Sequence, residues 1–68
     1  ELKQILINNI NKLSKQERMV ITLYYFEEFN LKEIGLILGV TESRISQIHS
    51  KSLIKLKLAI SKALTVTT

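Results

Sequence analysis

Apolar residues recur at steps of three and four along most of this 68-residue chain. Because an α-helix turns once every ~3.6 residues, this spacing aligns apolar side chains on one helix face. The first such stretch predicts a helix over residues 2 to 12, with an apolar face formed by Leu2, Ile5, Leu6, Ile10 and Leu13. No segment alternates convincingly with the period of two that a half-buried strand requires. The pattern therefore predicts an all-α fold.

Two helix-start signals divide the middle of the chain. Ser14 stands three residues before Glu17, and Asn30 stands three residues before Glu33, which is the spacing of a capping box. The first signal predicts a central helix from Lys15 to Phe29 that packs on several neighbours. Its apolar residues, expected in the core, are Met19, Val20, Ile21, Leu23, Tyr24, Tyr25 and Phe26. The second signal predicts a short third helix with an apolar face formed by Leu31, Ile34 and Leu38.

The third helix is expected to stop at Gly39, because glycine adopts the left-handed backbone of a tight turn without a side-chain clash. Thr41 then caps a fourth helix that begins at Glu42. Gly35 is small at the point where this last helix must cross closely. The inward face of the fourth helix is expected to carry Ile45, Ile48, Ser52, Leu56 and Ala59, while residues 65 to 68 fray. Together these features predict a four- to five-helix bundle that ends in a helix-turn-helix, in one domain over residues 1 to 68.

Composition and charge narrow the class of protein. The chain is 46% apolar and 24% charged, has no cysteine, and has no apolar run approaching the ~18 residues of a membrane span. No secretory signal is evident, so a soluble, cytoplasmic protein is expected. The net charge is +4, and residues 43 to 68 contain five basic residues and no acidic ones. This asymmetry is typical of a surface that meets nucleic acid, although a solvated lysine-rich helix would also produce it.

In a helix-turn-helix, the first turns of the second helix lie at the base edges of the major groove. The residues there are Glu42, Ser43, Ser46 and Gln47, which are predicted to contact bases. Arg44, Lys51 and Lys55 share one flank and are predicted to contact phosphates. Ile54 and Leu58 fall on the outward side, where an apolar patch predicts a protein interface.

The sequence gives little support for metal binding or acid–base catalysis. His49 has no second histidine or cysteine with which to bind a metal, so we expect it to pack or to form a hydrogen bond. Glu27 and Glu28 have no evident nucleophile or base beside them, so they are expected to be surface charges or part of a protein contact. The sequence thus predicts neither an enzyme nor a binding site for a metal, cofactor or small molecule.

Several runs of residues resemble the fourth conserved region of bacterial sigma factors, most closely the flagellar sigma-28 group. The resemblance covers residues 13 to 58. The runs that carry it are Leu13-Ser14-Lys15-Gln16-Glu17-Arg18, Leu23-Tyr24-Tyr25, Asn30-Leu31-Lys32-Glu33-Ile34-Gly35 and Glu42-Ser43-Arg44-Ile45-Ser46-Gln47-Ile48-His49-Ser50. The last run is the most specific, while residues 1 to 12 match no motif of the family.

The resemblance implies binding to the minus-35 promoter element as duplex DNA, docking on the flap of the RNA polymerase β subunit, and masking by an anti-sigma factor. Housekeeping members of the family generally have Arg and Glu where this chain has Glu42 and Ser43, and Arg where it has Ser46. This difference favours a promoter sequence other than the housekeeping one, consistent with motility genes.

Two alternatives remain open from the sequence. The first is a helix-turn-helix of a response regulator or another transcription factor, which would bind DNA as a dimer without polymerase. The second is a purely protein-binding helical domain, which Ile54 and Leu58 would favour. Because the chain begins without Met and enters a helical pattern at once, we also expect it to be a fragment of a longer protein.

Overall fold

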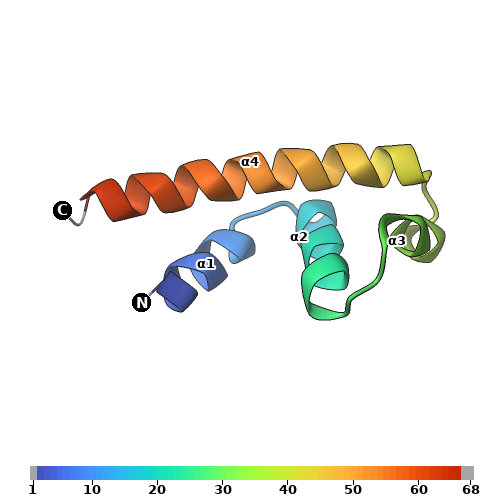
Figure 1. The fold of residues 1–68 in the computed structure, drawn as a ribbon, viewed down its shortest axis with the longest axis horizontal. Coiled ribbons are helices and arrows are strands. Elements are labelled where there is room, and N and C mark those ends of the chain that lie inside the picture. The colour runs from blue at the N-terminus through green and yellow to red at the C-terminus, as the bar shows by residue number, and fades with distance from the viewer. Residues whose placement is uncertain (1, 67–68) are drawn as a thin grey trace.

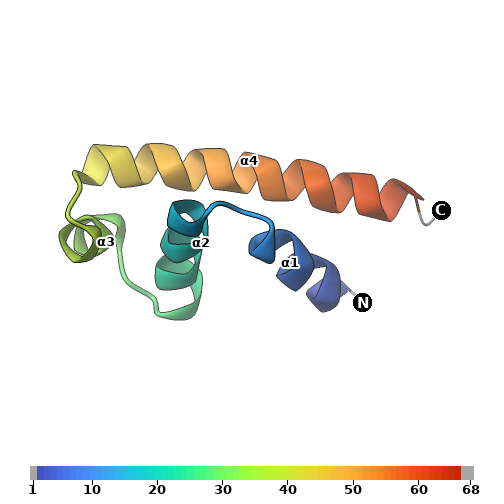
Figure 2. The same ribbon diagram turned by 180° about the vertical axis from the view of Figure 1, so that it is seen from behind.

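The computed structural model describes the backbone of residues 2–66 and the side chains of residues 3–62. Within this range the chain forms four α-helices and one π-helical turn: α1 (Leu2–Asn11), α2 (Lys15–Ile21), η1 (Thr22–Phe26), α3 (Leu31–Leu38) and α4 (Glu42–Val66). Helix α4 is a single rod, and the three shorter helices lie along one side of it (Figures 1 and 2). The predicted all-α fold is confirmed, and its elongated shape, 42 × 19 × 16 Å, follows from the length of α4.

The helices begin where the capping signals predict. At α2, the Ser14 hydroxyl accepts from the N–H of Glu17 at 3.2 Å, and the Glu17 carboxylate accepts from the N–H of Ser14 at 3.0 Å. The same reciprocal pair forms at α3 between Asn30 and Glu33, with both distances 2.8 Å. At α4, the Thr41 hydroxyl accepts from the N–H of Arg44 at 3.1 Å. Each pair satisfies backbone donors that a helix start leaves unpaired.

The predicted continuous helix from Lys15 to Phe29 is wrong. Regular α-helix ends at Ile21, and the next turn is π-helical, with the N–H of Glu27 bonded to the carbonyl of Thr22 at 3.1 Å. Glu28 then takes a positive φ of 61°, which ends the helical path. The core prediction for this segment is confirmed only in part. Val20 and Ile21 are buried and Leu23 and Tyr24 are partly buried, but the prediction is wrong for Met19, Tyr25 and Phe26, which are exposed.

The core consists of two apolar clusters along α4. One contains Val20, Ile34, Ile45 and Ile48, and it joins α2, α3 and α4. The other contains Leu13, Ile21 and Leu56, with Ile10 packed against it. Between them lies Ser52, which is fully buried and donates its hydroxyl to the Ile48 carbonyl at 2.7 Å. Because this bond satisfies the hydroxyl within its own helix, a polar side chain is tolerated at this buried position.

The predicted apolar faces of α1 and α4 are largely confirmed. Ile45, Ile48, Ser52 and Leu56 are buried, and Ala59 is partly buried. On the first face, Leu13 is buried and Ile5, Leu6 and Ile10 are partly buried, while the side chain of Leu2 lies outside the described residues. Of the residues expected to fray, Thr65 and Val66 instead complete α4, and Thr67 and Thr68 lie outside the described residues.

Two glycines fix the turn between α3 and α4. Gly39 has φ 74° and ψ 31°, the left-handed conformation predicted for it, and the N–H groups of Gly39 and Val40 both donate to the Gly35 carbonyl. At Gly35, a Cβ atom would lie 2.8 Å from the Val40 carbonyl oxygen. The close crossing predicted at Gly35 is therefore confirmed. No helix in the described part of the chain is both long and apolar enough to cross a membrane.

Candidate nucleic-acid interface

The first two turns of α4 present polar side chains to solvent beside a crossing helix. Glu42, Ser43, Ser46 and Gln47 are all exposed. Helix α3 is seen nearly end-on where α4 lies lengthwise, so the two helices cross steeply, as in a helix-turn-helix (Figure 1). The buried contacts of Ile34 with Ile45 and Ile48 hold this crossing together.

Two of the four predicted base-contacting residues share one side of α4. Ser43 and Gln47 are four residues apart, and at ~100° per residue both lie opposite Ile45, the most buried residue of this turn. Glu42 lies closer to α3, where it lines a shallow hollow with Tyr24, Asn30, Leu31 and Lys32. Ser43 and Gln47 therefore lie on the side of α4 that is opposite the core, and Glu42 lies on the side nearer α3.

A second hollow brings predicted base and phosphate contacts together. Arg44, Gln47 and Lys51 line it from α4, and Ser14, Gln16 and Glu17 line it from the start of α2. Its volume is about 360 Å³. Both basic side chains are exposed, so the hollow combines positive charge with hydrogen-bonding groups. The sequence pattern did not indicate Ser14 and Gln16, because their position beside α4 depends on how α2 packs.

Lys55 differs from the other two predicted phosphate contacts. Its ammonium group lies 2.8 Å from Oε2 of Glu17, although Lys55 remains 49% exposed and the Glu17 side chain only 9%. The hydrogen bond from Lys55, followed by that from the Ser14 N–H, holds the pKa of Glu17 below its usual value. Glu17 is therefore a carboxylate at neutral pH, and Lys55 already has an anionic partner within the chain.

His49 lies beside two tyrosines of η1. Its Nε2 is 3.1 Å from the Tyr25 hydroxyl, and its ring centroid is 4.6 Å from that of Tyr24. Partial burial lowers the pKa of His49, since desolvation disfavours the charged imidazolium. The packing and hydrogen-bonding role predicted for His49 is confirmed. Glu27 and Glu28 are exposed, as expected for surface charges, and in the described part of the chain no three acidic, histidine or cysteine side chains gather as a metal site would require.

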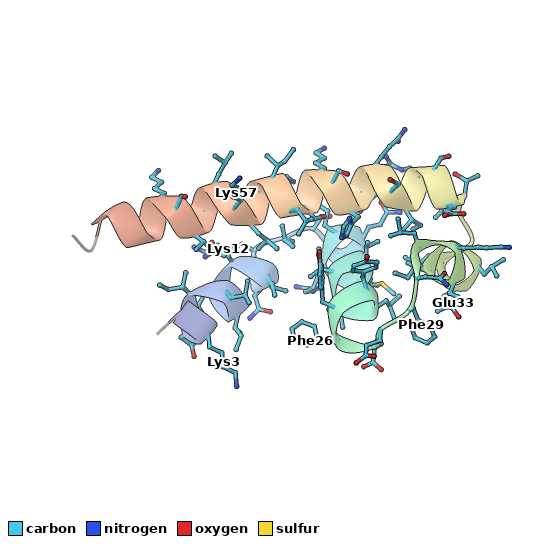
Figure 3. All side chains as sticks on the ribbon, viewed as in Figure 1. Lys3, Lys12, Phe26, Phe29, Glu33 and Lys57 are labelled. Carbon is cyan, nitrogen blue, oxygen red and sulfur yellow. The ribbon has the colours of Figure 1, made fainter. Side chains whose placement is uncertain are left out.

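Several large apolar side chains are exposed on different helices. Ile54 and Leu58, on the side of α4 away from the short helices, are 61% and 66% exposed, so their predicted outward position is confirmed. Leu36 and Ile37 of α3 are also exposed, as is Phe26, which Figure 3 shows at the end of η1 that is distant from α4. The sequence pattern assigned Phe26 to the core because an apolar residue on a helix gives the same signal in either environment.

The chain is similar to proteins of a known family. The family model described as "Sigma-70, region 4" matches residues 10–58. The RNA polymerase sigma factor FliA of Yersinia enterocolitica is 54% identical over 56 residues, which are 82% of this chain and 24% of that protein. The RNA polymerase sigma-D factor of Bacillus subtilis is 48% identical over 64 residues, which are 94% of this chain and 25% of that protein. The chain thus spans about a quarter of the length of these relatives.

Proposed function

Because this chain belongs to the sigma-70 region 4 family, we propose that it binds the minus-35 element of promoters as duplex DNA. The observation that carries the proposal is the outward position of Ser43 and Gln47 at the start of a helix that is held steeply across α3. In a helix-turn-helix, residues at these positions lie against base edges in the major groove. The proposed function is binding, and it assigns no catalytic residue.

Gln47 is the residue that we propose as the main base contact. A glutamine amide can donate to and accept from adenine at once, whereas the hydroxyls of Ser43 and Ser46 tolerate several bases. Glu42, at the edge of the helix, can accept from the amino group of cytosine. Arg44 and Lys51 beside Gln47 are proposed to contact phosphates, which set the register of the helix on the duplex.

We propose that this chain is part of a longer protein, a sigma factor that directs RNA polymerase to promoters of motility genes. The proposed location of that protein is the cytoplasm. The relatives are named RNA polymerase sigma factors, which supports the sigma-factor part of this proposal. Its proposed protein partners are the β flap of polymerase and an anti-sigma factor. The exposed Ile54 and Leu58 support a protein contact on α4, since a partner would cover apolar side chains that otherwise meet water.

The test of base contact is replacement of Gln47 by Ala. Loss of a bidentate contact worth ~1–3 kcal/mol is expected to weaken binding to the cognate promoter by about one to two powers of ten, while binding to random duplex hardly changes. The measurement is a competition titration in which wild type and variant rank a set of promoter duplexes that differ at single bases. Gln47→Ala with the wild-type ranking and a uniform loss of affinity would show that Gln47 is not a base contact.

A further inference from the structure

We infer that Glu17 and Lys55 are positioning residues, which fix the rotation of α4 against α2 and thereby the direction of Gln47. Lys55 then serves this ion pair and not a DNA phosphate. The inference rests on the proposed function, since it concerns how the base-contacting side chains are aimed.

Glu17 uses each of its carboxylate oxygens for a different task. Oε1 accepts from the N–H of Ser14 at 3.0 Å and completes the cap of α2. Oε2 accepts from Nζ of Lys55 at 2.8 Å, across 38 positions of sequence. One side chain therefore joins the beginning of α2 to the middle of α4, and the cap limits how far its carboxylate can move.

The ion pair lies beside an apolar contact between α2 and α4. Lys55 precedes Leu56, which belongs to the same cluster as Ile21 of α2, and it lies about one helical turn after the buried Ser52. Apolar contacts alone are non-directional, so they permit small rotations of one helix against another. A charged hydrogen bond between fixed partners has a preferred geometry and restricts that rotation.

Glu17 also lines the hollow that contains Gln47, Arg44 and Lys51. A rotation of α4 about its axis would move these side chains across the hollow together, because all three are on the same helix. A substitution at Glu17 or Lys55 therefore changes the direction of the Gln47 side chain, although neither residue contacts DNA.

Burial of Glu17 favours this role of Lys55 over a phosphate contact. The side chain of Glu17 is only 9% exposed. If Lys55 turned towards a phosphate, the Oε2 atom would keep its charge in a nearly buried position without its partner, which is costly. Arg44 and Lys51 carry no such constraint among the contacts that the structure describes.

The experiment compares three substitutions in the full chain that contains these residues, in complex with RNA polymerase core. Lys55→Met removes the ammonium group but keeps an aliphatic stem, and Glu17→Gln keeps an oxygen for the Ser14 cap but removes the charge. Lys62→Met is the matched control, since it removes one exposed positive charge from the same helix at a distance from Glu17. Lys55→Arg, which can keep the ion pair, tests for rescue.

If the ion pair positions α4, Lys55→Met and Glu17→Gln each reduce discrimination between the cognate promoter and its single-base variants about fivefold. The double variant discriminates no worse than either single variant, as expected for residues that act through one interaction. For both variants the slope of log affinity against log salt stays at the wild-type value. Lys55→Arg and Lys62→Met each retain the wild-type ranking of promoters. Circular dichroism and thermal unfolding identify any loss of fold.

Two results would overturn the inference. One is a wild-type ranking for Lys55→Met together with a salt slope smaller by about 0.9, which is the signature of one lost phosphate contact. The other is full additivity of the two single substitutions in unfolding and in ranking. A wild-type chain that fails to distinguish promoter from random duplex would overturn the proposed function and this inference together, and it is recognised before any substitution is made.

Discussion

Of the two glycines, Gly35 is the one that has no room for a side chain. A Cβ atom there would lie 2.8 Å from the Val40 carbonyl oxygen, which belongs to the backbone of the turn and cannot move aside freely. Gly35→Ala is therefore expected to destabilise the fold by ~1–3 kcal/mol, the usual cost of overpacking. Chemical denaturation of both proteins under identical conditions measures this difference.

Gly39 provides the matched comparison. Apart from its neighbours in the chain, no heavy atom lies within 4 Å of a Cβ built there, but its φ of +74° strains an alanine backbone. Gly39→Asn should recover much of the stability lost in Gly39→Ala, because asparagine tolerates left-handed backbone. Asparagine cannot relieve the clash at Gly35, because the problem there is lack of space and not backbone conformation. A Gly35→Ala protein as stable as wild type would show that the turn can open.

Residue-scale features were also the ones that sequence predicted best. The caps at Ser14, Asn30 and Thr41 and the turn at Gly39 all formed as expected. Each depends on interactions within four or five residues, so local sequence contains the information that determines it. The partner of Lys55 could not be predicted in this way. Its flank of α4 follows from helical geometry, but the presence of Glu17 on that flank depends on tertiary packing.

At the scale of elements, the segment after Ile21 shows where periodicity fails. Apolar residues on every side of the predicted helix indicated one long buried element. The chain instead forms a π-helical turn that brings Tyr24 and Tyr25 against His49. A π turn contains one more residue than an α turn would, so it shifts the face of every following residue. The hydrophobic pattern cannot indicate that shift, and it equally cannot separate a core residue from an exposed one such as Phe26.

The outward face of α4 is expected to contact a protein partner. Leu58 is 66% exposed and belongs to neither core cluster, so Leu58→Glu should leave the fold unchanged while weakening binding to polymerase core or to the anti-sigma factor about tenfold or more. Pull-down and titration with each purified partner measure the loss. Leu56→Glu, at a buried position two residues away, is expected to unfold the domain. Normal binding of folded Leu58→Glu to both partners would remove Leu58 from the interface.

At the scale of the whole molecule, α4 links the end that we propose contacts DNA to the rest of the fold. Its first turns cross α3, its middle is joined to α2 by Glu17 and Lys55, and its later turns pack on α1 through Leu56. The three short helices all lie on one side, so the opposite side of the rod is left open along its length (Figures 2 and 3). The fold thus holds one long helix in place from one side and leaves its outer surface exposed, where we propose that duplex and protein bind.

The charge of that surface determines how binding should respond to salt. Beyond Glu42 the described part of α4 contains basic residues and no acidic ones, so its approach to DNA releases counterions from phosphates. Affinity for promoter duplex is expected to fall steeply as salt rises, and Lys51→Ala should reduce the slope of log affinity against log salt by about 0.9. Lys3→Ala, the same charge change on α1, should leave the slope unaltered, because Lys3 lies on the far side of the short helices (Figure 3). Affinities measured across a salt series for the three proteins decide the matter: equal slopes for Lys51→Ala and wild type would exclude Lys51 from the phosphate contacts.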